Sequence, residues 1–244
     1  MNHRENMLAV LNYQAYDNMP VVHFGYWRQT LQKWANEGHI TQQEATCWKD
    51  GNVFDEILQK NFDLFKEIID TVGILWYETT KYILECSVQP DYAHYWEDIC
   101  FKNGPLVIPS VFDELVGIHY AKINNLLKEH DIHIVSVDCD GYIDHLLPTW
   151  LKNGVNTMFP IEVGTWNADI KPWREQYGKE LRGVGGMNKN VFAGDYADID
   201  KEIDRLKPLM SLGGYIPCPD HRIPPDAKFE SVQYYCEQLR KIIL

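Results

Sequence analysis

From residue 92 to the C-terminus, short apolar runs alternate with longer segments whose apolar residues follow helical spacing. The run at 132–137 is the clearest, because it stops abruptly at Asp138, Cys139 and Asp140 before the turn at Gly141. Units of one strand and one helix, repeated every roughly 25–40 residues, are typical of parallel strands joined by helical crossovers. The chain is therefore predicted to be an α/β protein with a parallel sheet.

The apolar runs predict six strands. They cover residues 21–24, 92–96, 132–137, 157–161, 181–185 and 215–216. Between residues 41 and 86 the apolar positions follow helical spacing, and no strand is predicted there. Either a (β/α)8 barrel or an open doubly wound sheet can be built from such units. The glycine-rich phosphate loop typical of open nucleotide-binding sheets is missing from the sequence, which favours the TIM-type barrel.

Composition narrows the classes of function. With 244 residues, 45% of them hydrophobic, the chain is long enough for one large α/β domain or two small ones, and a single domain spanning 1–244 is expected. A net charge of -12 argues against binding to nucleic acids or to anionic membranes, which needs clustered Lys and Arg. No apolar run approaches the roughly 20 residues that span a bilayer, and the first residues lack a signal-peptide pattern. The six cysteines show no CxxC pair, so reduced thiols and a cytoplasmic location are expected.

The last residues of parallel strands share one rim, and in barrels that rim carries the active site. The predicted rim residues are Glu97, Asp98, Asp138, Cys139, Asp140, Glu162, Asn188, Cys218, Asp220 and His221. Carboxylates together with an imidazole and thiols are the ligands of a divalent metal such as zinc. The alternatives stay open, since an aspartate at a strand end often caps the next helix and a single cysteine is often a core residue. His23, His94 and His145 are expected to be structural or surface groups.

Four stretches together resemble the uroporphyrinogen decarboxylase superfamily. They are 4–11 with 17–21, 137–148 with 153–156, 185–189, and 213–221 with 224–226. The superfamily consists of (β/α)8 barrels and includes decarboxylases and corrinoid-dependent methyltransferases, and the resemblance is stronger to the methyltransferases. It covers residues 1–60 and 64–244. The resemblance therefore implies the same barrel that the strand pattern favours.

The resemblance also implies a ligand set. In the methyltransferase branch zinc is held by a His-x-Cys motif after the fifth strand and by a cysteine after the eighth. In this chain those positions fall on Asp138, Asp140 and His221, with Cys139 and Cys218 nearby as alternative ligands. Two carboxylates and an imidazole form a harder site than an imidazole and two thiolates, so another divalent ion is an alternative to zinc.

Catalytic and substrate-binding roles are expected from other rim positions. Glu97 and Glu162 are expected as fourth ligand or general acid, and His221 has a catalytic role in either branch. The substrate-binding residues expected are Trp27, Arg28, Trp96, Asn188 and Arg222.

The family pattern breaks near residues 63–64, as if a segment had been deleted. The second and third strands of the barrel are missing, which leaves an incomplete barrel of about six strands. Unpaired sheet edges favour association, so a homodimer is one expected outcome.

Three functions follow in order of preference. The first is metal-assisted transfer of a methyl group between a small methylated substrate and a corrinoid carried by a partner protein. The second is a lyase, uroporphyrinogen decarboxylase of porphyrin biosynthesis, although the family's Arg-rich loop is replaced here by 25–29, with only Arg28. The third is a shortened barrel without catalytic activity.

Overall fold

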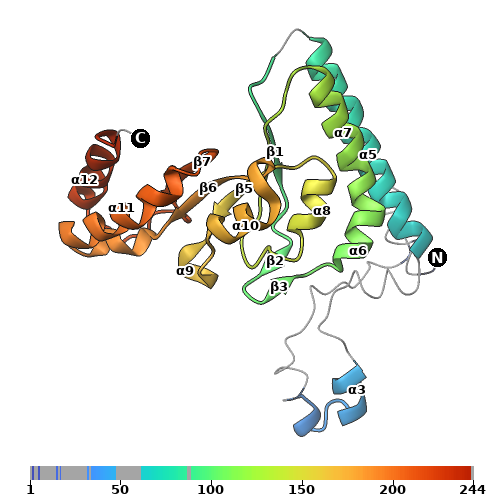
Figure 1. Cartoon of the computed structure of the whole chain (residues 1–244). Helices are drawn as coiled ribbons and strands as arrows, with labels where there is room; N and C mark the ends of the chain where they lie inside the picture. The colour runs from blue at the N-terminus through green and yellow to red at the C-terminus, as the bar shows by residue number, and fades with distance from the viewer. Residues whose placement is uncertain are drawn as a thin grey trace. The chain divides into compact units, whose positions relative to one another are not determined.

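The computed structural model describes residues 2, 5, 15, 17, 32, 34–47, 62–86 and 89–242. The chain divides into two compact units, Met1–Ile68 and Ile69–Leu244, and each is described by itself. The first unit contains α3 (Gln42–Cys47), and the long helix α5 (Phe62–Glu85) begins in it and continues in the second (Figure 1). The predicted strand at 21–24 lies outside the described residues.

A parallel sheet of five strands forms the second unit. In spatial order the strands are β1 (Ala93–Trp96), β4 (Val135–Asp138), β5 (Thr157–Ile161), β6 (Arg182–Met187) and β7 (Tyr215–Pro219). These are five of the six predicted strands. Two further strands, β2 (Cys100–Phe101) and β3 (Gly104–Pro105), form a separate antiparallel ribbon. The sheet corresponds to part of an α/β barrel wall, and within the described residues β1 and β7 each have one neighbour.

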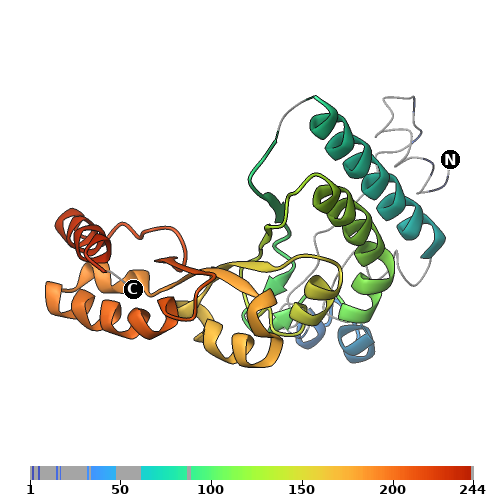
Figure 2. The same cartoon turned by 45° about the horizontal axis from the view of Figure 1, so that its top comes forward.

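Helices connect the successive strands, and a last helix follows β7. They are α6 (Pro109–Phe112), the π-helical turn η1 (Asp113–Gly117), α7 (Ile118–Glu129), α8 (Leu147–Lys152), α9 (Val163–Trp166), α10 (Ile170–Tyr177), α11 (Tyr196–Met210) and α12 (Phe229–Arg240), with short 3-10 turns η2 (Gly178–Glu180) and η3 (Lys189–Ala193). Crossovers between parallel strands have one hand, so strands in sequential order place their helices along one face of the sheet. Figures 1 and 2 show these helices following one another along the sheet. Among the described residues, no helix has the length and apolar character needed to cross a membrane.

The core lies between the strands and these helices. Tyr95 of β1 stacks on Tyr120 of α7 with ring centroids 4.2 Å apart, and Val135 and Val137 of β4 are buried beside them. Because side chains alternate along a strand, the intervening residues of β1 and β4 point to the opposite face. This second face, the inner face of a barrel wall, carries His94 and Trp96 on β1 and Ser136 and Asp138 on β4, paired in register.

The loop after β4 packs tightly against the β2–β3 ribbon. Tyr142 N donates a hydrogen bond to Phe101 O at 2.9 Å. Gly141 has a φ of 91°, and a Cβ added there would lie 2.8 Å from Phe101 O. Only glycine fits both the conformation and the space, so the turn predicted at this position also fixes how the loop lies.

Candidate metal centre

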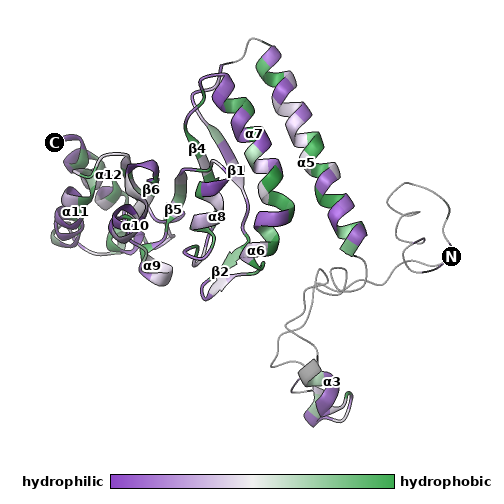
Figure 3. Ribbon diagram, turned by 45° about the vertical axis from the view of Figure 1, so that its right-hand side comes forward, coloured by the Kyte–Doolittle hydropathy of each residue, from purple (hydrophilic) through white to green (hydrophobic). Residues whose placement is uncertain are grey.

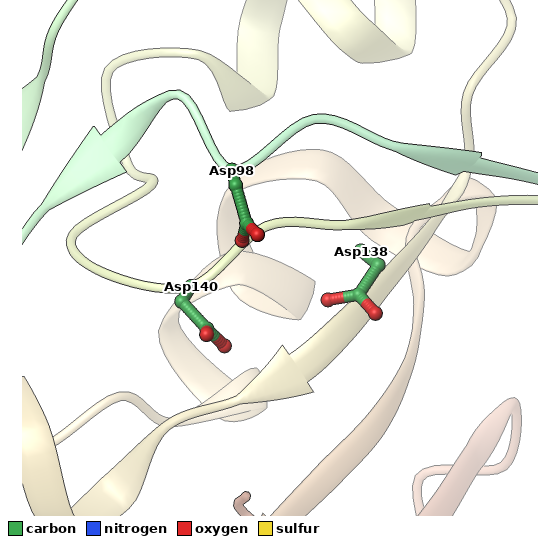
Figure 4. Close-up of side chains that lie close together, drawn as sticks. All are labelled: Asp98, Asp138 and Asp140. Carbon is green, nitrogen blue, oxygen red and sulfur yellow. The ribbon is translucent and has the colours of Figure 1, made fainter.

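Three carboxylates gather at the carboxyl ends of β1 and β4. One oxygen each of Asp98, Asp138 and Asp140 lies within 4.8 Å of the others. Asp138 is the last residue of β4, Asp140 follows in its loop, and Asp98 lies in the loop after β1. Figure 4 shows the three side chains converging on a shared space. Two of these residues are ligands expected from the sequence, and the third was expected only on the rim.

The backbone at Asp98 is in an uncommon conformation. Its φ of 45° lies in the left-handed region, which costs a non-glycine residue on the order of 1 kcal/mol. Trp96 Nε1 donates to Asp98 Oδ2 at 2.9 Å and fixes the carboxylate. The strained turn thus places the exposed carboxylate of Asp98 close to the other two.

The neighbouring carboxylates affect the pKa of Asp138. Burial raises the pKa of its carboxyl, and the negative charges of Asp140 and Asp98 raise it further, while His94 and His221 oppose the shift. A raised pKa means that the charged form is destabilised in this environment. A bound cation would remove the repulsion among the three carboxylates.

His94 contributes an imidazole on the inner face of β1. Ser136 Oγ donates to Ala93 O at 3.2 Å, which leaves the hydroxyl oxygen to accept from His94 Nδ1 at 2.8 Å. The neutral imidazole is then protonated on Nδ1, and Nε2 carries a lone pair 4.0 Å from Asp138 Oδ2. A proton on Nε2 or a cation bound by both atoms would make this contact attractive. Metal-binding histidines are commonly held through their other ring nitrogen in this way.

His221 lies at the same end of the sheet, just after β7. Its Nε2 is 3.3 Å from Asp140 Oδ2, and both side chains are partly exposed. The structure therefore brings together Asp138, Asp140 and His221, and adds Asp98 and His94. His94 was expected to be structural or a surface group. The signal that identifies it is the two-residue spacing from Trp96, which places it on the inner face of the strand.

The cysteines lie apart from this cluster. Cys139 is 1% exposed and turns into the core, where it contacts Cys100. The hydrogen bond between the two thiols, together with burial, raises the pKa of Cys100. Cys218 is half-buried, its Sγ–H donates to Pro219 O, and burial raises its pKa to about 11. The raised pKa of Cys218 disfavours its thiolate, which is the form that binds metals, and Cys139 is enclosed in the core.

Glu162, expected as ligand or general acid, is buried behind the loop that carries Asp140. One carboxylate oxygen accepts from Gly141 N at 2.6 Å, and the other accepts from Thr165 Oγ1 at 3.0 Å. With both oxygens occupied, the carboxylate anchors the β4 loop to the end of β5. Its position is that of a residue that orients the acidic loop.

Asp220 has a related position under the ends of β5, β6 and β7. Its carboxylate is fully buried, accepts from Gly164 N at 2.6 Å, and pairs with Lys189 Nζ at 3.2 Å. Lys189 N also donates to it. The residue next to His221 thus ties three strand ends together, a role that only the folded chain reveals.

The residues expected to bind substrate are spread along the rim. Trp96 is 71% exposed on the inner face, opposite Asp138 in register. Asn188 accepts from Asn190 N and caps the turn after β6, and Arg222 is exposed after β7. Trp27 and Arg28 lie outside the described residues.

Glu97 provides a pH-dependent prediction. Burial raises the pKa of its carboxyl from 4.5 to about 7. The folded state then binds more protons than the unfolded chain between these values, so stability falls as pH rises through that window. Glu97→Gln is expected to be more stable than wild type by up to about 3 kcal/mol at pH 8, and by little at pH 5. Urea unfolding at both pH values measures this.

The matched control is Glu114→Gln, since Glu114 is exposed on the π-helical turn. It should change stability little at either pH. An equal gain for Glu97→Gln at pH 5 and pH 8 would contradict the assignment of a raised pKa.

The comparisons with known proteins bear on the fold. No protein-family model matches the sequence. No curated protein matches it either. One similar solved structure is a methyltransferase from Methanosarcina mazei, with a TM-score of 0.55 at 16% sequence identity. The match covers 75% of this chain and 51% of that protein, so the chain spans about half the length of its neighbour. At this identity the likeness concerns the fold, and the chain has a methyltransferase-like α/β fold.

Proposed function

We propose that the chain is a metal-assisted methyltransferase that acts between a small methylated substrate and a corrinoid carried by a partner protein. The observation that supports this most is the convergence of Asp98, Asp138 and Asp140 with His94 and His221 at one end of the parallel sheet. The methyltransferase-like fold supports the reaction class. The corrinoid partner follows from the family resemblance alone.

The donor set fits a divalent cation. Oxygen ligands about 2.1 Å from such an ion lie roughly 3 to 4 Å from one another. The oxygens of the three carboxylates now lie within 4.8 Å of one another, so small side-chain rotations would bring them to this spacing. Carboxylates and imidazoles without a thiolate accept zinc, and they also suit manganese or iron(II). Zinc thus remains the ion that the family implies, while the ligand types extend the choice to harder ions.

The other residues of this end of the sheet have matching roles. A bound cation supplies Lewis acidity at the substrate heteroatom. Glu97 directly follows β1, and burial raises the pKa of its carboxyl to about 7, so part of it is protonated at neutral pH, as a general acid requires. Trp96 presents its exposed ring beside Asp138, where it can pack against a methylated group.

The charge of this end disfavours the lyase. A porphyrinogen with eight carboxylates needs Arg or Lys around it. Here this end of the sheet carries three carboxylates, and the ammonium group of Lys189 pairs with buried Asp220. The alternative of uroporphyrinogen decarboxylation is therefore less well supported than methyl transfer.

Metal analysis of the purified protein tests the proposal. We expect about one divalent ion per chain by elemental analysis after reconstitution with zinc, manganese or iron(II), with loss of methyl transfer on chelation and recovery on adding the ion back. Methyl transfer is followed from small methylated ethers, thiols or amines to free cobalamin in its cob(I) state. Binding of no divalent ion, or full activity after complete chelation, would reject the proposal.

A further inference from the structure

Helix α5 has one face that is packed within the second unit. Leu84 is buried, and the Asp70 carboxylate bonds Nε2 of the buried His119 on α7 at 2.9 Å. Gly73 lets the His119 ring approach so closely that an added Cβ would lie 2.3 Å from it. These contacts fix α5 alongside α7, as Figures 1 and 3 show.

The opposite face of α5 is apolar and exposed. Val72, Leu75, Thr79 and Tyr82 follow one another in steps of three, four and three residues. Leu75 is 61% and Tyr82 69% exposed, while Trp76 and Ile83 extend the face on one side and are about half exposed. Green bands recur along α5 in Figure 3. We call these six residues the α5 seam.

The spacing of the α5 seam is that of a helix that packs against another helix. Apolar residues at alternating intervals of three and four form the contact line of coiled coils and helix bundles. A continuous apolar patch of this kind is among the largest that a soluble monomer exposes, and such patches are often interaction sites. Side chains of this size, about half exposed, bury on the order of 500 Å² per copy, or about 1,000 Å² in a pair, which reaches the lower limit of specific interfaces.

We infer that the α5 seam is a surface through which two copies of this chain associate. The seam carries no charged side chain, so two copies of a protein with a net charge of -12 can meet there without opposing like charges. The charged residues beside it on the same helix include Glu78, Lys81 and Glu85, and Lys81 pairs with Glu85 at 3.9 Å. A two-fold contact uses the same patch on both copies, so the seam serves as its own partner.

The position of the seam next to strand β1 also favours a second copy of this chain as its partner. Trp76 stacks against Tyr95 of β1, with ring centroids 6.3 Å apart and planes 7° from parallel. The seam therefore adjoins β1, which has one neighbour among the strands of the described sheet. In each copy, a second copy on the seam would lie next to this edge of the described sheet.

Analytical ultracentrifugation of the full chain over a concentration series tests the inference. Wild type is expected to be dimeric at micromolar concentration. Leu75→Glu is expected to raise the dimer dissociation constant at least about a hundredfold, since each copy would bury an unpaired charge. The matched control is Ile74→Glu, because Ile74 is 56% exposed on the same helix but off the seam, and this variant should remain dimeric.

Circular dichroism and thermal unfolding verify that both variants fold. A monomeric wild type at 100 µM would overturn the inference, and the seam would then belong to the chain's own N-terminal residues or to another protein. Dimers of Leu75→Glu with unchanged affinity would overturn it as well, and so would equal weakening by Ile74→Glu. The result is independent of metal content, so it stands or falls separately from the proposed function.

Discussion

Replacing Asp138 with alanine is expected to weaken divalent-cation binding at least about a hundredfold and to abolish methyl transfer. Asp138 is the central member of the cluster, because both Asp140 and His94 face it and burial already destabilises its charge. Loss of a direct ligand exceeds the 10- to 100-fold loss typical of removing a group that only orients one. Isothermal titration with zinc and manganese measures the affinity.

Two kinds of control sharpen this result. Asp91→Ala removes an exposed carboxylate just before β1 and should leave cation affinity unchanged. Cys139→Ser and Cys218→Ser separate the carboxylate site from the thiolate alternatives, and each should retain affinity within about threefold of wild type. Unchanged affinity in Asp138→Ala, or a large loss in either serine variant, would contradict the carboxylate and imidazole site.

Replacing Asp220 with alanine is expected to destabilise the fold by about 3–5 kcal/mol, because it leaves the ammonium group of Lys189 without its buried partner. The substitution also removes the acceptor of Gly164 N. Urea unfolding near neutral pH measures the loss, and the slope of the transition shows whether the unfolding remains two-state.

The double variant Asp220→Ala/Lys189→Met provides the control. Removing both charges abolishes the unpaired ammonium, so the double variant is expected to recover part of the stability that Asp220→Ala loses. If the stability that the double variant loses equals the sum of the losses in Asp220→Ala and in Lys189→Met, the two groups do not interact as a buried pair.

The strands of the second unit were predictable because each combines a short apolar run with a polar end. The run that stops at Asp138 is β4, and Pro217 to Asp220 mark the end of β7. The place of Asp138 and Asp140 on the rim followed from the same pattern, while their assignment as ligands came from the family resemblance. An apolar run and the polar residues that end it are neighbours in the sequence, so a single sequence is enough to reveal them.

Other parts of the site depend on contacts between distant segments. The bond from Glu162 to Gly141 joins residues 21 positions apart, and Asp220 meets Gly164 across 56. No local pattern distinguishes these carboxylates from a ligand or a helix cap. The inward direction of Cys139 likewise depends on its packing against Cys100, which belongs to a ribbon that the sequence did not predict.

The alternation of side chains along β1 and β4 affects how a ligand reaches the carboxylates. In a closed barrel of eight strands, inward side chains fill the interior and a ligand enters through a narrow end. Here the inward Trp96 is 71% exposed and His94 is exposed beside it. Within the described residues, the carboxylates therefore lie next to side chains that solvent reaches, and discrimination between ligands would depend on which groups line this face instead of on the width of an entrance.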